Sequence, residues 1–127
     1  MRKSRKPALV KVVLDTSSYV SALLSPHGVS ASVFELVTQG MVLNFYTEEI
    51  FKEVKTVIAR QKFNLPDQKQ KQFADLIQES SYQLQALEMF QIKKCRDQND
   101  DKFLSLAQQA DADFIVSWDD DLLILEK

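Results

Sequence analysis

Apolar and polar positions follow two different repeats along this chain of 127 residues. Nearly continuous apolar runs occupy Leu9–Leu14, Met41–Tyr46 and Phe114–Ser117. Runs of this length predict strands that are buried on both faces, as in a parallel sheet. Between these runs, apolar residues recur at the helical spacing of three and four positions, which predicts helices.

The helical segments have clear end signals. Thr47 is a favourable N-cap, and Glu48 and Glu49 suit the positive end of the helix that follows it. Gly40 predicts the end of the preceding helix. We expect helices in Thr16–Leu24 after a loop, at Ser30–Gln39, from Glu48 onward, from Pro66 to about Ser80, and at Asp101–Ala110. The inward positions are predicted to be Val33, Phe34, Val37, Ile50, Phe51, Val54, Val57, Ile58, Phe73, Leu76 and Ile77.

The alternation of strands and helices predicts the fold class. Right-handed strand–helix–strand crossovers would give a parallel sheet with helices on both faces. We therefore expect an α/β fold, a three-layer α/β/α domain with a mainly parallel sheet of four or five strands. The pattern over Tyr82–Ile92 is ambiguous and includes a candidate short strand near Met89–Ile92. We assign residues 1–8 to a basic N-terminal arm and residues 9–127 to one domain.

The composition is that of an ordinary globular domain, with 45% hydrophobic and 27% charged residues. Two Gly and three Pro argue against an all-β fold rich in tight turns. The single cysteine, Cys95, excludes an internal disulfide and a cysteine-based metal site. Lys11 and Asp15 interrupt the apolar stretch that a signal peptide would need, and no run approaches the roughly 20 residues of a membrane span. These features predict a cytoplasmic protein.

The net charge of −2 conceals an uneven distribution. Basic residues dominate Met1–Lys11 and recur at Lys52, Lys55, Arg60 and Lys62, whereas acidic residues gather in the C-terminal third. An acidic patch beside basic stretches is typical of a metal site next to a phosphate-binding surface. The distribution also fits a normal solvated surface, which is the interpretation that charge alone favours.

Four carboxylates could meet at one rim of the predicted sheet. Asp15 directly follows the first strand and Asp119 follows the last one after a single residue, and parallel strands bring both ends to the same rim. Asp100 stands at the start of the helix before that last strand, and Glu53 lies just off the apolar arc of the helix after the second strand. Clustered carboxylates repel one another unless a cation joins them, and oxygen ligands of this type favour Mg²⁺ or Mn²⁺.

Each acid also has a purely structural interpretation. Asp15 could simply end a strand, Asp100 could be a helix N-cap, Glu53 could be a solvated helix residue, and Asp119 could belong to an Asp-rich turn. The joint arrangement is more informative than any single acid. A Ser-His-Asp or Cys-His mechanism has little support, because the chain contains one His and one Cys.

Four segments carry these acids, in the order Val12–Leu23 with its Asp15-Thr16-Ser17, Tyr46–Phe63, Asp97–Leu104 and Phe114–Leu123. Together they resemble the PIN-domain family, which includes VapC-like ribonuclease toxins. The resemblance covers nearly the whole chain. The most similar subgroup contains toxin components of toxin–antitoxin pairs.

The resemblance implies a set of site residues. The acidic quartet that binds the metal would be Asp15, Glu53, Asp100 and Asp119. Ser17 and Ser117, which stand where the family often has Asn and Thr, would orient carboxylates or water. Asp100 is assigned rather than Asp101 by alignment with the helix Lys102–Ala110, and Asp97 and Asp121 are accessory candidates.

The activity implied by the resemblance is hydrolysis of RNA phosphodiesters, assisted by one or two Mg²⁺ or Mn²⁺ ions that activate water and stabilise the leaving oxygen. Lys52, Lys55 and Arg60 could hold the RNA backbone. The implied partners are an RNA substrate, an antitoxin protein and a second copy of the chain in a homodimer.

Two other functions were weighed. A receiver-like phosphoacceptor domain needs an acidic pair after the first strand and a Lys after a late strand, whereas Asp15 stands alone and Trp118 with an Asp run follows the last strand. A catalytically degenerate PIN-like domain that binds RNA or a protein partner is the main alternative. Retention of all four acids argues against it.

Overall fold

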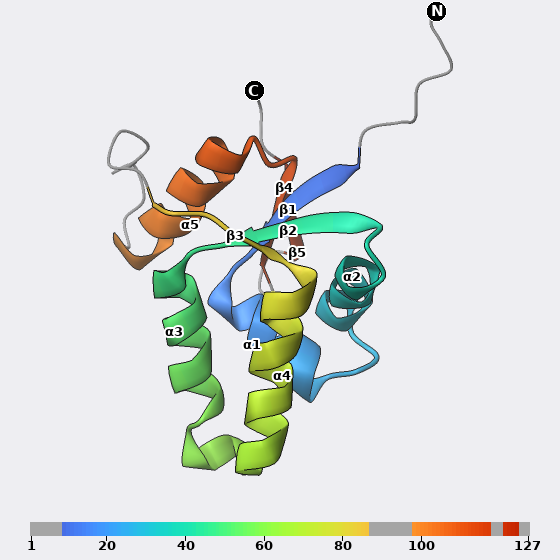
Figure 1. Cartoon of the computed structure of the whole chain (residues 1–127), viewed down its shortest axis with the longest axis vertical. Coiled ribbons are helices and arrows are strands. Elements are labelled where there is room, and N and C mark those ends of the chain that lie inside the picture. Colours follow the sequence, from blue (N-terminus) through green and yellow to red (C-terminus); the bar gives the residue numbers. More distant parts are fainter. Residues whose placement is uncertain (1–8, 87–97, 118–120, 125–127) are drawn as a thin grey trace, which may run out of the picture.

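The strands form one sheet in the order β3-β2-β1-β4-β5 (Figure 1). The structure, a computed structural model, describes residues 9–86, 98–117 and 121–124, with the side chains of residues 9–86 and 102–117. Within these residues the strands are β1 (Val10–Leu14), β2 (Val42–Tyr46), β3 (Tyr82–Gln83), β4 (Phe114–Ser117) and β5 (Asp121–Ile124).

Strand β1 occupies the centre of the sheet. Its Val12 pairs with Asn44 of β2 on one side and with Phe114 of β4 on the other, in parallel register. Strand β3 adds to β2 in parallel, and β5 adds to β4 in the antiparallel direction. The mainly parallel sheet that we predicted is therefore confirmed, with an additional antiparallel edge strand.

The described helices are α1 (Thr16–Leu24), α2 (Val29–Thr38), α3 (Glu48–Ile58), α4 (Asp67–Ser80) and α5 (Gln98–Ala110). Helix α5 packs against β1, β2 and β4 on one side of the sheet, and α1 and α2 lie on the other side (Figure 1). Helices α3 and α4 form an antiparallel hairpin through the short 3-10 helix η1 (Gln61–Phe63), and α3 also packs against α1. The α/β class is confirmed.

The predicted helix ends at Gly40 and Thr47 are confirmed in detail. Gly40 has a φ of +78°, and the backbone N–H groups of Gly40 and Met41 donate to the carbonyls of Val37 and Leu36. This is the Schellman arrangement that ends a helix with a left-handed residue. At the start of α3 the Thr47 hydroxyl accepts from the N–H of Ile50 at 3.3 Å, which satisfies one of the free donors of the first turn.

The core joins the two faces of β1 to the helices. Val13 and Leu14 are fully buried, and Ile50, Val54 and Ile58 fill the predicted inward stripe of α3. Burial of such side chains supplies most of the driving force for folding, at about 1.5–3 kcal/mol each. The prediction for Leu76 was wrong: its side chain is 38% exposed, because α4 turns only Phe73 and Ile77 fully inward.

A buried polar cluster crosses this core. The Asn44 side chain of β2 donates to the Tyr19 hydroxyl at 2.8 Å and to the Ser81 hydroxyl at 2.9 Å. The cluster therefore connects β2 with α1 and with the end of α4. Burial raises the pKa of Tyr19 far above its ordinary value, so the phenol stays protonated across the usual pH range.

Several expectations fall at the edges of the described chain. The short strand of the ambiguous segment is Tyr82–Gln83, whereas Met89–Ile92 and the basic arm at residues 1–8 lie outside the described residues. Helix α5 begins at Gln98, earlier than expected. Of the described helices, none alone is long and apolar enough to cross a membrane; α1 and α2 reach that only as a pair bent by 93°.

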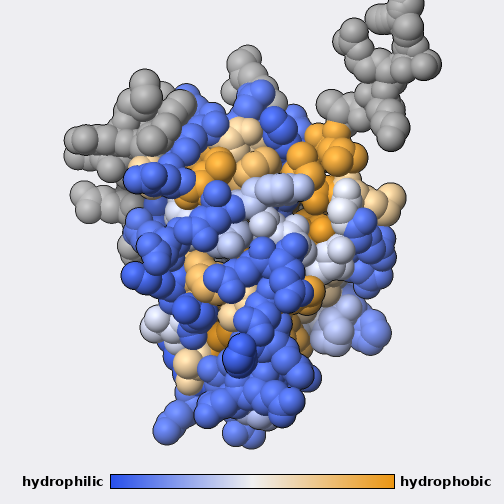
Figure 2. All heavy atoms as spheres, viewed as in Figure 1, coloured by the Kyte–Doolittle hydropathy of each residue, from blue (hydrophilic) through white to orange (hydrophobic). Residues whose placement is uncertain are grey.

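The two ends of the molecule differ in surface character. Figure 2 shows apolar residues gathered near the amino ends of β1 and β2, where Leu9, Val10 and Met41 are exposed. The hairpin of α3 and α4 has a mostly hydrophilic surface in the same view. The exposed apolar residues near the amino ends of β1 and β2 therefore lie away from the carboxyl ends of the strands, where ligands of such folds bind.

Candidate functional site

Asp15 lies at the junction between β1 and α1. Its backbone N–H donates to the Val116 carbonyl of β4 at 3.1 Å, which ties the carboxyl ends of the two strands together. Its side chain is the N-cap of α1, since Oδ1 accepts from the Ser18 N–H at 2.8 Å. Asp15 thus does more than end a strand: it starts the next helix at the rim of the sheet.

Two serines fix the position of this carboxylate. The Ser17 hydroxyl donates to the same Oδ1 of Asp15 at 2.8 Å. The buried Ser18 hydroxyl donates to the Val116 carbonyl at 2.6 Å and anchors the first turn of α1 to β4. The bonds from the Ser17 hydroxyl and the Ser18 N–H to Oδ1 limit the rotation of the Asp15 side chain. Among the residues that the structure describes, its second oxygen, Oδ2, has no hydrogen-bond partner.

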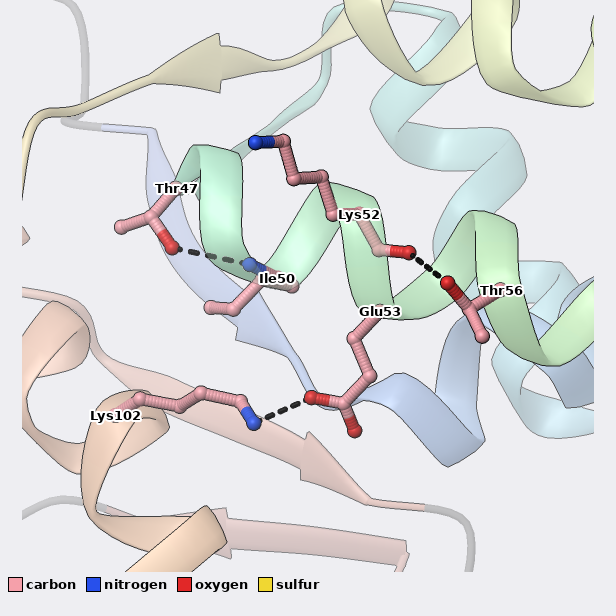
Figure 3. A network of polar contacts seen from close by, with 6 residues as sticks. All are labelled: Thr47, Ile50, Lys52, Glu53, Thr56 and Lys102. Carbon is pink, nitrogen blue, oxygen red and sulfur yellow. Dashed lines mark hydrogen bonds and ion pairs between the residues drawn. The ribbon is translucent and has the colours of Figure 1, made fainter.

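Glu53 projects from α3 toward α5 and pairs there with Lys102 (Figure 3). The apolar stripe of α3 leaves Glu53 at the boundary between core and solvent, as the sequence predicted, and its side chain is 35% exposed. The Lys102 side chain is only 15% exposed, and its ammonium lies 5.2 Å from the Phe103 ring centre. Glu53 is therefore an ion-paired carboxylate and not a freely solvated one.

The packing of the elements brings Asp15 and Glu53 to the same region. Helix α3, which carries Glu53, packs against α1, which begins at Asp15. Helix α5, which carries Lys102, packs against β1, which ends just before Asp15. The Glu53–Lys102 pair therefore joins the helix that packs against α1 to the helix that packs against β1.

The other predicted site residues are described only in part. Ser117 ends β4, is half-buried, and is paired in the sheet with Asp121 of β5. Asp100 belongs to the first turn of α5 by its backbone, and its side chain is outside the described set. Asp97 and Asp119 lie outside the described residues. The structure gives side-chain contacts for three of the predicted site residues, Asp15, Ser17 and Glu53.

The donor set fits a hard divalent cation. Asp15 and Glu53 offer carboxylate oxygens, the ligands that Mg²⁺ and Mn²⁺ prefer. The Lys102 ammonium already stands against Glu53 as a positive charge at this position. Among the described residues there is no cluster of three or more metal-ligating side chains, and the side chains of Asp100 and Asp119 lie outside that set.

Two hollows lie next to α3, and neither is lined by Asp15, Glu53 or Lys102. A cleft of 550 Å³ lies at the carboxyl ends of β2 and β3 and is lined by Thr47, Glu48, Glu49, Gln83, Leu84, Gln85 and Ala86. A groove of 390 Å³ runs between α3 and α4 and includes Lys55 and Lys71 in its wall.

Burial raises the pKa of Tyr46, which ends β2 next to Thr47. This phenol is therefore a neutral group at physiological pH.

Sequence reasoning missed two residues of this region. Ser18 was not singled out, although its buried hydroxyl joins α1 to β4. Lys102 was read only as part of an acidic motif, although it pairs with Glu53. A lysine two positions after the candidate Asp100 was the available signal, but its partner is on another helix and no local spacing reveals it.

Comparison with known proteins adds the family context. The family model described as PIN domain matches residues 11–121 of the chain. The uncharacterized protein MJ1680 of Methanocaldococcus jannaschii is 26% identical over 117 residues, which is 91% of this chain and 75% of that protein. The range matched by the family model, residues 11–121, includes every predicted site residue from Asp15 to Asp119.

Proposed function

The chain belongs to the PIN-domain family, a family of nuclease-type domains, and we propose that it is a Mg²⁺- or Mn²⁺-dependent endoribonuclease that serves as the toxin of a toxin–antitoxin pair. The family supports the general assignment as a hydrolase that uses a divalent metal. The choice of RNA and the toxin role rest on the resemblance of the four acidic segments to VapC-like toxins.

One observation carries the proposal. The Asp15 carboxylate is held at the carboxyl end of the central strand by two hydrogen bonds of 2.8 Å, beside the helix that carries Glu53. A carboxylate that only capped a helix would not require a second carboxylate on the adjacent helix. Lys102 neutralises Glu53 in this structure, and a divalent cation that displaced the ammonium would neutralise both carboxylates.

In this proposal the acidic residues bind the metal and the serines orient them or water. Asp15 and Glu53 would hold the metal together with Asp100 and Asp119. When bound, the cation would supply activation of water and neutralisation of charge on the phosphate. Ser17 orients Asp15 through its hydroxyl, and Ser117 would orient water or a carboxylate at the end of β4. These contacts keep the acids in place before the substrate arrives.

The RNA backbone would run over the basic side of the hairpin. Lys52, Lys55 and Arg60 are exposed on or next to α3, and Lys55 also borders the groove between α3 and α4. Lysine and arginine side chains in such a row neutralise successive phosphates, so binding should weaken steeply with salt. The partners in this proposal are RNA, an antitoxin protein and a second copy of the chain.

We also propose that the enzyme acts in the cytoplasm, with residues 1–8 as a basic arm and residues 9–127 as the PIN-like nuclease domain. Sedimentation at high micromolar concentration tests the homodimer, and a purely monomeric protein would remove it.

Cleavage of a panel of RNAs tests the activity. We expect purified protein to cut RNA with Mg²⁺ or Mn²⁺ and to stop when EDTA removes the metal. Glu53→Gln should lower the rate of RNA cleavage at least about 100-fold, because the metal loses a negatively charged ligand. Glu48→Gln on the same helix is the matched control, since Glu48 is 69% exposed and its ion-pair partner among the described residues is Lys52, at 3.9 Å. RNA binding without metal-dependent cleavage would instead identify a degenerate domain.

A further inference from the structure

Lys102 forms the most shielded ion pair that the described residues contain (Figure 3). The pairs within α3 and within α4 have side chains that are 48% to 78% exposed, against 15% for Lys102 and 35% for Glu53. The Glu53–Lys102 pair also joins two different helices. Shielding and a tertiary location both make such a pair stronger than an exposed pair on one helix.

Lys102 binds the carboxylate of Glu53, which is the group that a metal would bind. Its ammonium contacts Oε1 of Glu53 and neutralises that charge. A divalent cation on Glu53 would come close to this ammonium, and two positive charges a few ångströms apart in a partly shielded region repel strongly. The two cations therefore compete for Glu53.

We propose that Lys102 is a built-in counter-cation of the metal site, which holds Glu53 until a divalent ion displaces it. This inference rests on the proposed function, because it assumes that Glu53 is a metal ligand. Lys102 is then a positioning residue that acts through Glu53. The flexible lysine stem allows the ammonium to move, and the neighbouring Phe103 ring offers it a second favourable contact.

The competition between Lys102 and the divalent cation determines the affinity of the site for metal. By linkage, any stabilisation that Lys102 gives to metal-free Glu53 is subtracted from the binding of the cation. Removing the ammonium should therefore tighten metal binding, by about tenfold if the coupling lies at the low end of the usual range. A lysine with only a structural role would have the opposite effect, because its loss would loosen Glu53 and weaken the site.

Calorimetric titration with Mn²⁺ distinguishes these two effects. We compare wild type with Lys102→Met, Lys102→Arg and the control Lys71→Met, which removes an exposed lysine paired with Asp75 on α4. Lys102→Met should bind Mn²⁺ about tenfold more tightly, melt at a lower temperature without metal, and gain more from added Mn²⁺. Lys102→Arg keeps the charge and should stay close to wild type, as should Lys71→Met.

Unchanged or weaker Mn²⁺ binding by Lys102→Met would overturn the inference. If this variant does not fold without metal, recovery of its fold by Mn²⁺ supports the inference, and failure to recover overturns it; Lys102→Gln repeats the test with a second neutral side chain. Wild type that binds Mn²⁺ but leaves RNA uncut would refute only the proposed activity. Wild type that does not bind Mn²⁺ would refute both proposals.

Discussion

Asp15 has two roles that substitution can separate. Its Oδ1 caps α1 through the Ser18 N–H and also accepts from the Ser17 hydroxyl, both at 2.8 Å. Asp15→Asn keeps an oxygen for both bonds, whereas Asp15→Ala removes the acceptor. Only the metal role requires the negative charge, so the two substitutions should agree in activity and differ in stability.

The expected magnitudes follow from these contacts. Asp15→Ala should cost about 1 kcal/mol of unfolding free energy for the lost cap, within a range of about 0.5–2. Asp15→Asn loses about 0.3–1 kcal/mol of charge–dipole interaction at the start of α1, offset by relief of carboxylate repulsion, so it should stay within about 1 kcal/mol of wild type. For a domain of this size, 1 kcal/mol corresponds to about 3–5 °C in thermal midpoint.

The assay combines thermal midpoints, with and without Mn²⁺, and cleavage of a fluorescent RNA. Both Asp15 variants should lose at least about 100-fold in cleavage, and neither should gain the wild-type stabilisation by Mn²⁺. Thr47→Ala provides the converse control: it removes the cap of α3, should cost about 1 kcal/mol, and should leave cleavage intact. Undiminished Mn²⁺-dependent cleavage by Asp15→Asn would show that Asp15 is a cap and not a ligand.

Three further substitutions test the packing. Because the native state keeps the Tyr19 proton above pH 10, where an unfolded tyrosine releases it, the unfolding free energy should fall as pH rises past about 10, and Tyr19→Phe should flatten that slope in chemical denaturation. The same variant should cost about 1–3 kcal/mol at neutral pH, since Asn44 loses an acceptor in the core; no loss would argue against this bond. Gly40→Ala should cost about 1 kcal/mol because φ is +78°, although no atom lies within 4 Å of the added Cβ, and an unchanged midpoint would contradict this backbone. Ile77→Ala should cost about 2–5 kcal/mol by urea titration as a cavity in a fully buried position, and a loss below 1 would indicate that α4 is loosely packed.

Local signals in the sequence were sufficient for most elements of the fold. The Val-rich run of β1, the cap at Thr47 and the left-handed residue at Gly40 depend on neighbours a few positions away, and each occurs where it was expected. Strand β3 was missed because it has two exposed residues and hence no burial pattern. Strand β5 was not predicted, because its residues Asp121–Ile124 follow an acidic run and pairing with β4 determines it.

The candidate site was predictable only to the level of its elements. The end of β1 gave Asp15, and the edge of the apolar stripe of α3 gave Glu53. The partner of Glu53 could not be predicted, because Lys102 reaches it only through the packing of α5 near α3. Likewise, the bond from the Ser18 hydroxyl to Val116 joins residues 98 positions apart, and no sequence period indicates such a contact.

The central place of β1 has a consequence for synthesis. One neighbour of β1 is β4, and the bond from Lys11 to Asp113 next to that pairing spans 102 positions. A growing chain on the ribosome therefore leaves one edge of β1 unpaired until β4, about 100 residues later, has been made. Contacts of such long range also form slowly, because their loop-closure entropy must be overcome first. If Asp119 completes the site, a nascent chain has no assembled nuclease until the segment after β4 has been made.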